Sequence, residues 1–152
     1  MSDVVSSVGT GVSVSANAPA TYNEAGFEAL TWSLVGELAE LPAFGAEAAL
    51  ATHTPLKTGI VAKRRGSLNY GSVALTMAVS DADTGQTVLQ DAAEAAAGTD
   101  AQVSVKVVLV NGETQYFTGQ VMSYKVNVGN ADAITMAEVT LEIDNSVVKV
   151  AA

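Results

Sequence analysis

Hydrophobic residues recur mainly at every second position along this chain, a spacing that predicts β-strands with one buried face. Residues 72–79 alternate in this way, and in residues 138–144 the apolar positions alternate with acidic and hydroxyl side chains. Residues 103–110 carry apolar side chains at consecutive positions near their end, which indicates burial on both faces. Residues 30–34 give a fourth, shorter alternation. The whole pattern predicts roughly seven to nine strands.

The strongest turn signal is Asn111-Gly112, since both residues tolerate the positive φ angles of a type I′ hairpin turn. In the strand expected after it, residues 114–128, the apolar positions change phase near Gly119. A glycine at such a change predicts a β-bulge or a bend.

One segment has a helical period instead. The sequence DADTGQTVLQDAAEAAAG, residues 81–98, places Val88 and several alanines on one helical face. Asp83 is the expected N-cap, with Gln86 at the capping-box position, and Gly98 is a C-terminal stop signal. Because the apolar stripe is narrow, we expect this helix to lie against a sheet.

Two segments lack a clear pattern. Residues 1–19 are rich in Ser, Gly and Val, which suits a flexible N-terminal arm, although the valines could also start a strand. Residues 53–66 contain a proline, two glycines and a group of cations, which predicts a long inter-strand loop. The expected fold is mainly β: two packed antiparallel sheets, or a barrel, with one flanking α-helix. The length suits a single domain, residues 1–152.

Composition narrows the class of protein. Apolar residues make up 49% of the chain, so a folded domain is expected. The absence of cysteine excludes disulfides, zinc–thiolate sites and a cysteine nucleophile, and it fits a reducing compartment. The sequence shows no signal-peptide pattern and no apolar run near the ~20 residues of a membrane helix. We therefore expect an intracellular product.

Charge is distributed unevenly along the chain. The formal net charge is -9 and the pI is about 4.3, so the protein as a whole repels nucleic acid. Four of the seven cationic residues nevertheless lie in the short stretch KTGIVAKRR. Such a cluster predicts contact with an acidic partner. The alternative is a solvated basic loop that discourages edge-to-edge aggregation.

No catalytic or metal-binding constellation stands out. His53 is the only histidine, and an ordinary loop histidine is favoured over a general base. The stretch DADTG, residues 81–85, resembles a calcium-binding loop only faintly, because the glycine and the final glutamate of an EF-hand are misplaced. The acidic residues are scattered. We expect a protein that is not an enzyme and that needs no cofactor or metal.

Four segments, taken in order, resemble the major tail tube proteins of long, non-contractile-tailed bacteriophages. The segments are TWSLVGELAELPAFG (31–45), THTPLKTGIVAKRRGSLNYGSVALTM (52–77), SDADTGQTVLQDAAEA (80–95) and NGETQYFTGQVMSY (111–124). The resemblance covers about residues 20–147, and the order and spacing of the segments carry it rather than any one motif.

This resemblance implies a structural subunit of a phage tail, in which hexameric rings stack into a hollow tube that conducts DNA into the host. It implies a virion protein assembled in the host cytoplasm around a tape-measure protein, with tail-terminator and tail-tip or baseplate proteins as further partners. DNA would pass through the lumen without specific binding, and no membrane insertion is implied. The inner sheets of adjacent subunits would join into a barrel, the helix would pack outside, and the long loop would reach the next ring.

Two surfaces follow as hypotheses. A positive face on the loop would contact acidic groups of the next ring, through Lys57, Lys63, Arg64 and Arg65. A neutral to acidic strand face would line the lumen, because a cationic wall would hold DNA; this face carries Glu138, Thr140, Glu142 and Asp144. An ordinary solvent face of an outer sheet is an equally good interpretation of that strand.

Other interpretations remain open at this point. A contractile-tail or type VI secretion inner-tube subunit would share the architecture. A secreted β-sandwich binding or adhesion module, or a barrel for a small ligand, would share the β pattern alone. If the N-terminus and the long loop order only on docking, the entropy cost would keep monomers soluble before assembly starts.

Overall fold

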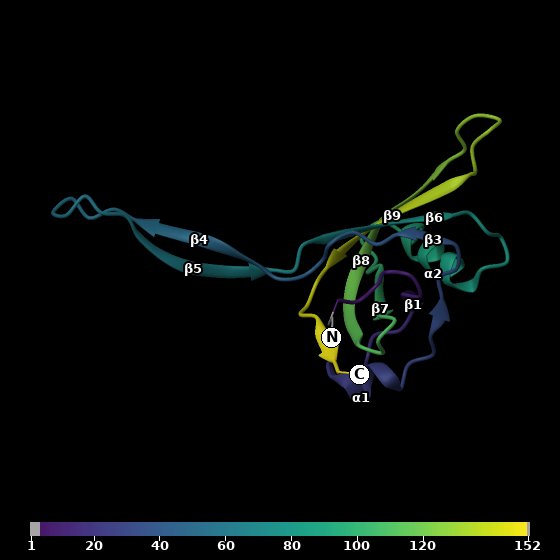
Figure 1. Cartoon of the computed structure of the whole chain (residues 1–152), viewed down its shortest axis with the longest axis horizontal. Coiled ribbons are helices and arrows are strands. Elements are labelled where there is room, and N and C mark those ends of the chain that lie inside the picture. Colours follow the sequence, from purple (N-terminus) through teal and green to yellow (C-terminus); the bar gives the residue numbers. More distant parts are fainter. Residues whose placement is uncertain (1–3, 152) are drawn as a thin grey trace.

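The computed structural model describes residues 4–151 and confirms a mainly β fold (Figure 1). A curled antiparallel sheet forms the body, and a two-stranded hairpin projects from it. No helix among the described residues has both the length and the apolar composition to span a membrane. The elements are β1 (Gly11–Ser15), α1 (Glu24–Glu28), β2 (Ser33–Leu34), β3 (Leu38–Glu40), β4 (Glu47–His53), β5 (Ala62–Asn69), β6 (Ser72–Ala78), α2 (Thr84–Ala93), β7 (Gln102–Val108), β8 (Thr114–Asn127), β9 (Met136–Ile143) and β10 (Val148–Val150).

The strand order forces the main sheet to curl. The order is β2-β1-β7-β8-β9-β6-β3, and β10 pairs with the start of β8. Strands β2 and β3 therefore lie at opposite edges of the sheet, although only residues 35–37 separate them in the chain. A connection this short spans at most about 14 Å. The two edges must approach each other, and the sheet wraps around its core.

The core fills the inside of this curl. Alternate residues of β1, β6, β7, β8 and β9 point into it, as the period of two predicted. Leu75, Val105 and Val139, from three different strands, are each 1% exposed or less. Helix α2 contacts β1, β2, β7 and β8, and its Leu89 is fully buried in the same core. The predicted flanking helix therefore closes the core.

Helix α2 begins where the sequence predicted and ends earlier. The Asp83 side chain caps it by accepting a hydrogen bond from the N–H of Gln86 at 3.1 Å. Gln86 does not complete a capping box. Its buried side-chain amide instead donates to the carbonyl oxygens of Gly36 and Ala78, at 3.1 and 2.8 Å. The last helical residue is Ala93, short of the predicted glycine stop.

Helix α1 covers one end of the outer face of the sheet, the face that points away from the core. The sequence pattern did not predict this helix. Asn23 is its N-cap. The Phe27 ring stacks on Tyr116 of β8 with 5.1 Å between centroids, and Trp32 packs against the same tyrosine. The alternation of residues 30–34 had predicted a strand here. Only its last two residues pair with β1, because Trp32 belongs to the aromatic cluster instead.

The N-terminal segment contains a strand, so the prediction of a flexible arm is wrong for residues 11–15. Strand β1 is hydrogen-bonded on both sides, to β2 and to β7. Its Val12 and Val14 are 1% and 0% exposed. Valines two positions apart fill the core together, which outweighs the mobile composition around them. Residues 1–3 lie outside the described part of the chain.

Two predicted irregularities of the chain are present, but the first has a different turn type and the second a different position. The hairpin at Asn111-Gly112 exists, but only the glycine has a positive φ, of 93°. The Leu109 N–H donates to the Glu113 carbonyl, which makes a three-residue loop rather than a type I′ turn. The irregularity predicted in β8 lies at the β8–β9 register shift between Val121 and Ser123, beyond Gly119.

Candidate functional site

Strands β4 and β5 form a hairpin that extends far from the body (Figure 1). We call residues 47–69 the arm. Every residue of β5 is solvent-exposed. The predicted loop over residues 53–66 is therefore wrong in part: only residues 54–61 connect the strands, and the cationic stretch belongs to β5. Cross-strand hydrogen bonds satisfy the backbone of a segment that has no core beneath it.

The four predicted contact cations all lie on the arm, but they do not form one face. Lys57 lies in the turn, whereas Lys63, Arg64 and Arg65 are consecutive on β5. Successive strand residues point to opposite sides. The register therefore places Lys63 and Arg65 on one face, with Leu50 opposite Arg65, and Arg64 on the other face. The expected single positive face is divided in two.

Charge separates the arm from the rest of the chain. The arm holds four of the seven Lys and Arg residues but only one, Glu47, of the sixteen Asp and Glu residues. Its formal net charge is thus +3, and that of the remaining chain is -12. A cationic projection on an acidic body is complementary to another copy of the same chain.

The arm also exposes large apolar side chains, which the sequence analysis did not use. Leu56 and Ile60, in the turn, are 103% and 73% exposed, and Leu50 and Leu68 are 66% and 52% exposed. Apolar side chains gathered on a projecting element mark a contact surface. The signal was present in the sequence as Leu56, Ile60 and Val61, three large apolar residues inside a loop-like segment.

The predicted lumen-facing strand lies in the middle of the sheet, with β9 between β6 and β8. Glu138, Thr140 and Glu142 are exposed or half-buried, while the alternate residues of β9 are buried, as predicted. On neighbouring strands the same face carries mostly small or polar side chains. Their registers place Ser72, Ala74 and Thr76 of β6 and Gln120, Ser123 and Lys125 of β8 beside β9.

Asp144, the fourth residue of that predicted set, follows β9 and is engaged in cross-strand contacts. Its carboxylate accepts hydrogen bonds from the Thr118 hydroxyl at 2.6 Å and from the Gln102 amide at 2.9 Å. It therefore joins the end of β9 to β7 and β8, and its charge is less available to a passing ligand than those of Glu138 and Glu142.

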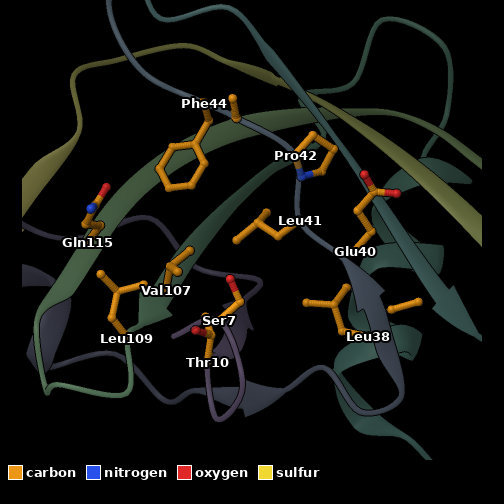
Figure 2. Close-up of a pocket in the computed structure, with 12 residues that line it drawn as sticks. Ser7, Thr10, Leu38, Glu40, Leu41, Pro42, Phe44, Val107, Leu109 and Gln115 are labelled. Carbon is orange, nitrogen blue, oxygen red and sulfur yellow. The ribbon is translucent and has the colours of Figure 1, made fainter. Parts of the chain in front are cut away.

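A groove of about 530 Å³ lies beside residues 38–44, the segment that leads to the base of the arm (Figure 2). Its central lining includes Leu41, Phe44 and Val107, and the N-terminal turn with Thr10 lies along one side. Glu40 stands at the rim. No sequence pattern predicted this groove, because three segments far apart in the chain build it.

Three tyrosine hydroxyls have pKa values above the ordinary range. Burial raises the pKa of the Tyr22, Tyr116 and Tyr124 hydroxyls, and nearby carboxylates reinforce the rise at each. Among residues 4–151, no group of three or more His, Asp or Glu side chains is placed to hold a metal ion. His53 is exposed at the end of β4.

Comparisons with known proteins give matches in structure only. No protein-family model matches the sequence, and no curated protein matches it. The SPP1 tail tube protein superposes with a TM-score of 0.63 at 15% identity, over 94% of this chain and 77% of that chain. A chain of the anti-feeding prophage baseplate, symmetrised sixfold, gives 0.67 at 11% identity, over 99% and 97%. A chain of a gene transfer agent tail with C6 symmetry gives 0.58 at 16% identity, over 79% and 87%.

A chain of the sheath–tube complex of an extracellular contractile injection system also matches, with a TM-score of 0.62 at 13% identity, over 94% of this chain and 88% of that chain. The protein thus has the fold of phage tail tube proteins, as the sequence resemblance predicted. At such low identities, what these likenesses show is the shared architecture.

Proposed function

We propose that this protein is the structural subunit of a bacteriophage tail tube, and that its copies form rings that stack into a hollow tube. The observation that carries the proposal is the superposition of 94% of the chain on the SPP1 tail tube protein, with a TM-score of 0.63.

The arm gives the stacking its chemical basis. Stacked rings make head-to-tail contacts, which require two different and complementary surfaces on one subunit. An arm of net charge +3 and a body of net charge -12 meet this requirement. Lys57, Lys63, Arg64 and Arg65 are the proposed inter-ring contacts, divided between the turn and the two faces of β5.

The finer assembly follows the same reasoning. We propose hexameric rings, supported by the sixfold symmetry of two of the superposed assemblies. The outer face of β9, with Glu138, Thr140 and Glu142, would line the lumen. DNA carries about one negative charge per 1.7 Å, so a polar, net acidic wall lets it pass without binding. Assembly would take place in the host cytoplasm around a tape-measure protein, with terminator and tail-tip proteins at the ends.

A second candidate is the inner tube of a contractile tail or injection system. It is favoured by the superposition of 94% of this chain on a chain of the sheath–tube complex of an extracellular contractile injection system. The two candidates differ in whether a sheath surrounds the tube. A sheath gene beside the coding gene, or co-purification with sheath protein, would assign the tube to the contractile class.

The test is negative-stain microscopy and sedimentation velocity of the purified protein at rising concentration. We expect stacked rings with sixfold end views. The matched control replaces residues 49–67 by Asn-Gly, a two-residue turn that joins the paired positions Ala48 and Leu68. This variant is expected to keep the folded body and to form no tubes. A protein that stays monomeric at every concentration, with or without the arm, would contradict the proposal.

A further inference from the structure

The end of the arm, residues 54–61, carries large apolar side chains that are exposed to solvent rather than packed on the body of the same chain. We call these residues the tip. Leu56 is 103% exposed and Ile60 is 73% exposed, and both lie in the turn between β4 and β5. Lys57 stands between them in sequence. Water contact at such a tip is unfavourable, so a tip of this composition gains most by entering an apolar recess.

The groove at the base of the arm is a recess with an apolar centre and a polar margin, to which Thr10, Glu40 and Gln115 contribute. Leu41, Phe44 and Val107 line its centre, and Leu38 and Leu109 flank them (Figure 2). Leu38, Leu41, Phe44 and Leu109 are only partly buried and pack on the core from one side. All four also line the groove, so its apolar wall rests on the core.

A tip cannot reach the groove of its own chain without dismantling the arm. Phe44 lies just before β4 begins, so the groove is at the root of the hairpin. Strand β4 has seven residues, which corresponds to a length of about 23 Å. The tip thus stands at least about that far from the groove, and its partner must come from another copy.

Charge complements this apolar fit. Glu40 stands on the rim of the groove and is exposed, and Lys57 adjoins Leu56 at the tip. The same pairing repeats at the scale of the whole molecule, because the arm is net positive and the remaining chain net negative.

We propose that the tip of one copy inserts Leu56 and Ile60 into this groove on the next copy, and that Lys57 pairs with Glu40 there. The inference rests on the proposed function, since it names the partner surface of the inter-ring arm. Each copy carries one tip and one such groove, so every copy can insert its tip into one neighbour and accept the tip of another. Such a head-to-tail contact leaves a free tip and a free groove at the two ends of any stack, which allows growth without limit.

The first test uses the absence of native cysteine. Two variants are prepared, Leu56→Cys and Thr10→Cys, where Thr10 lines the groove. They are mixed, assembled and mildly oxidised. We expect a disulfide-linked pair of one copy of each, with at most a tenth of that yield in the control mixture of Leu56→Cys with Glu24→Cys. Glu24 is an exposed residue on α1 that does not line the groove.

The second test is a charge exchange. Lys57→Glu or Glu40→Lys alone is expected to raise the critical concentration for assembly by about tenfold. A single chain that carries both changes restores the pair between neighbours and should assemble within about twofold of the unchanged protein. Thermal unfolding of the isolated subunits should be unaltered in all three, because both residues are exposed.

The outcomes separate this inference from the proposed function. Tubes that form normally while Leu56→Cys fails to link with Thr10→Cys overturn the tip-in-groove contact and leave the tail tube assignment in place. Linked pairs that never grow into tubes support the contact and contradict the assignment. A groove already filled by the first residues of its own chain would also prevent the link, and would overturn the inference.

Discussion

The carboxylate of Asp83 accepts a hydrogen bond from the backbone N–H of Gly36 at 2.9 Å, across 47 positions of the chain. The same oxygen atom caps α2 by accepting from the N–H of Gln86 at 3.1 Å. Gly36 lies in the short connection between the two edge strands of the curled sheet. One side chain therefore ties the helix start to the place where the sheet closes.

Replacement of Asp83 by alanine should destabilise the subunit measurably. It removes a helix cap and leaves the Gly36 N–H without its partner, which together cost about 2–3 kcal/mol. For a chain of this size the expected fall in Tm is roughly 4–12 °C. Asp83→Asn should recover part of the loss, because asparagine also caps. The control is Asp81→Ala, at an exposed position two residues earlier, which should leave Tm nearly unchanged.

The division of the arm cations predicts which face of β5 makes the contact. Lys63 and Arg65 share a face with the exposed Leu50, whereas Arg64 lies on the opposite side. We expect the face that carries Leu50 to contact the next copy. Lys63→Glu with Arg65→Glu should then block tube formation, and Arg64→Glu should have a clearly smaller effect. Turbidity and microscopy of assembly reactions compare the two variants. If both variants assemble as well as the unchanged protein, none of these three cations takes part in the contact.

A third prediction concerns the polar face of β9. Glu138→Lys with Glu142→Lys should slow the ejection of DNA from assembled particles, since cationic walls exchange phosphates for counterions. The delay should shorten at higher salt concentration. Asp91→Lys with Glu94→Lys, at exposed positions on α2 and at its C-cap, changes the net charge by the same amount and serves as the control. Unchanged ejection in the double variant would place this face away from the lumen.

These glutamates are a cleaner choice for that experiment than Asp144. The Asp144 carboxylate is hydrogen-bonded to Thr118 and Gln102, so its replacement would disturb the junction of three strands as well as the charge.

Alkaline pH should destabilise the subunit through three tyrosines that are buried or half-buried. Burial raises the pKa of Tyr22, Tyr116 and Tyr124 above the ordinary value of 10.0. A raised folded-state pKa means that the folded state binds more protons, so the stabilisation is complete below pH 10.0 and is lost as pH rises through the folded-state value. We expect Tm to be level up to about pH 9.5 and to fall above it.

Tyr22→Phe isolates one of these contributions. The Tyr22 hydroxyl donates to the carbonyl oxygen of Ser146, which links the segment before α1 to the loop before β10. The variant should be less stable at neutral pH and should lose less stability between pH 9.5 and 11 than the unchanged protein. Absorbance at alkaline pH, which follows tyrosine ionisation directly, checks the assignment. A steeper fall in the variant would contradict it.

The sequence by itself determined the elements whose signals are local. The alternation in β6, β7 and β9, and the cap at Asp83, depend on side chains a few positions apart, so one segment is enough to predict them. The unequal distribution of charge is likewise a property of the chain, and so is the presence of large apolar residues at the tip.

Only the tertiary structure decided what depends on distant partners. Residues 24–28 are helical, and Trp32 leaves the strand pattern, because Tyr116 of β8 completes their aromatic cluster. The stretch from Lys63 to Arg65 became a strand because β4 pairs with it, and this pairing sends its cations to two faces. The groove beside Phe44 exists only where three separate segments meet. Local preference fixes single elements, but contacts between distant segments fix which faces they present, and it is these faces that another copy would meet.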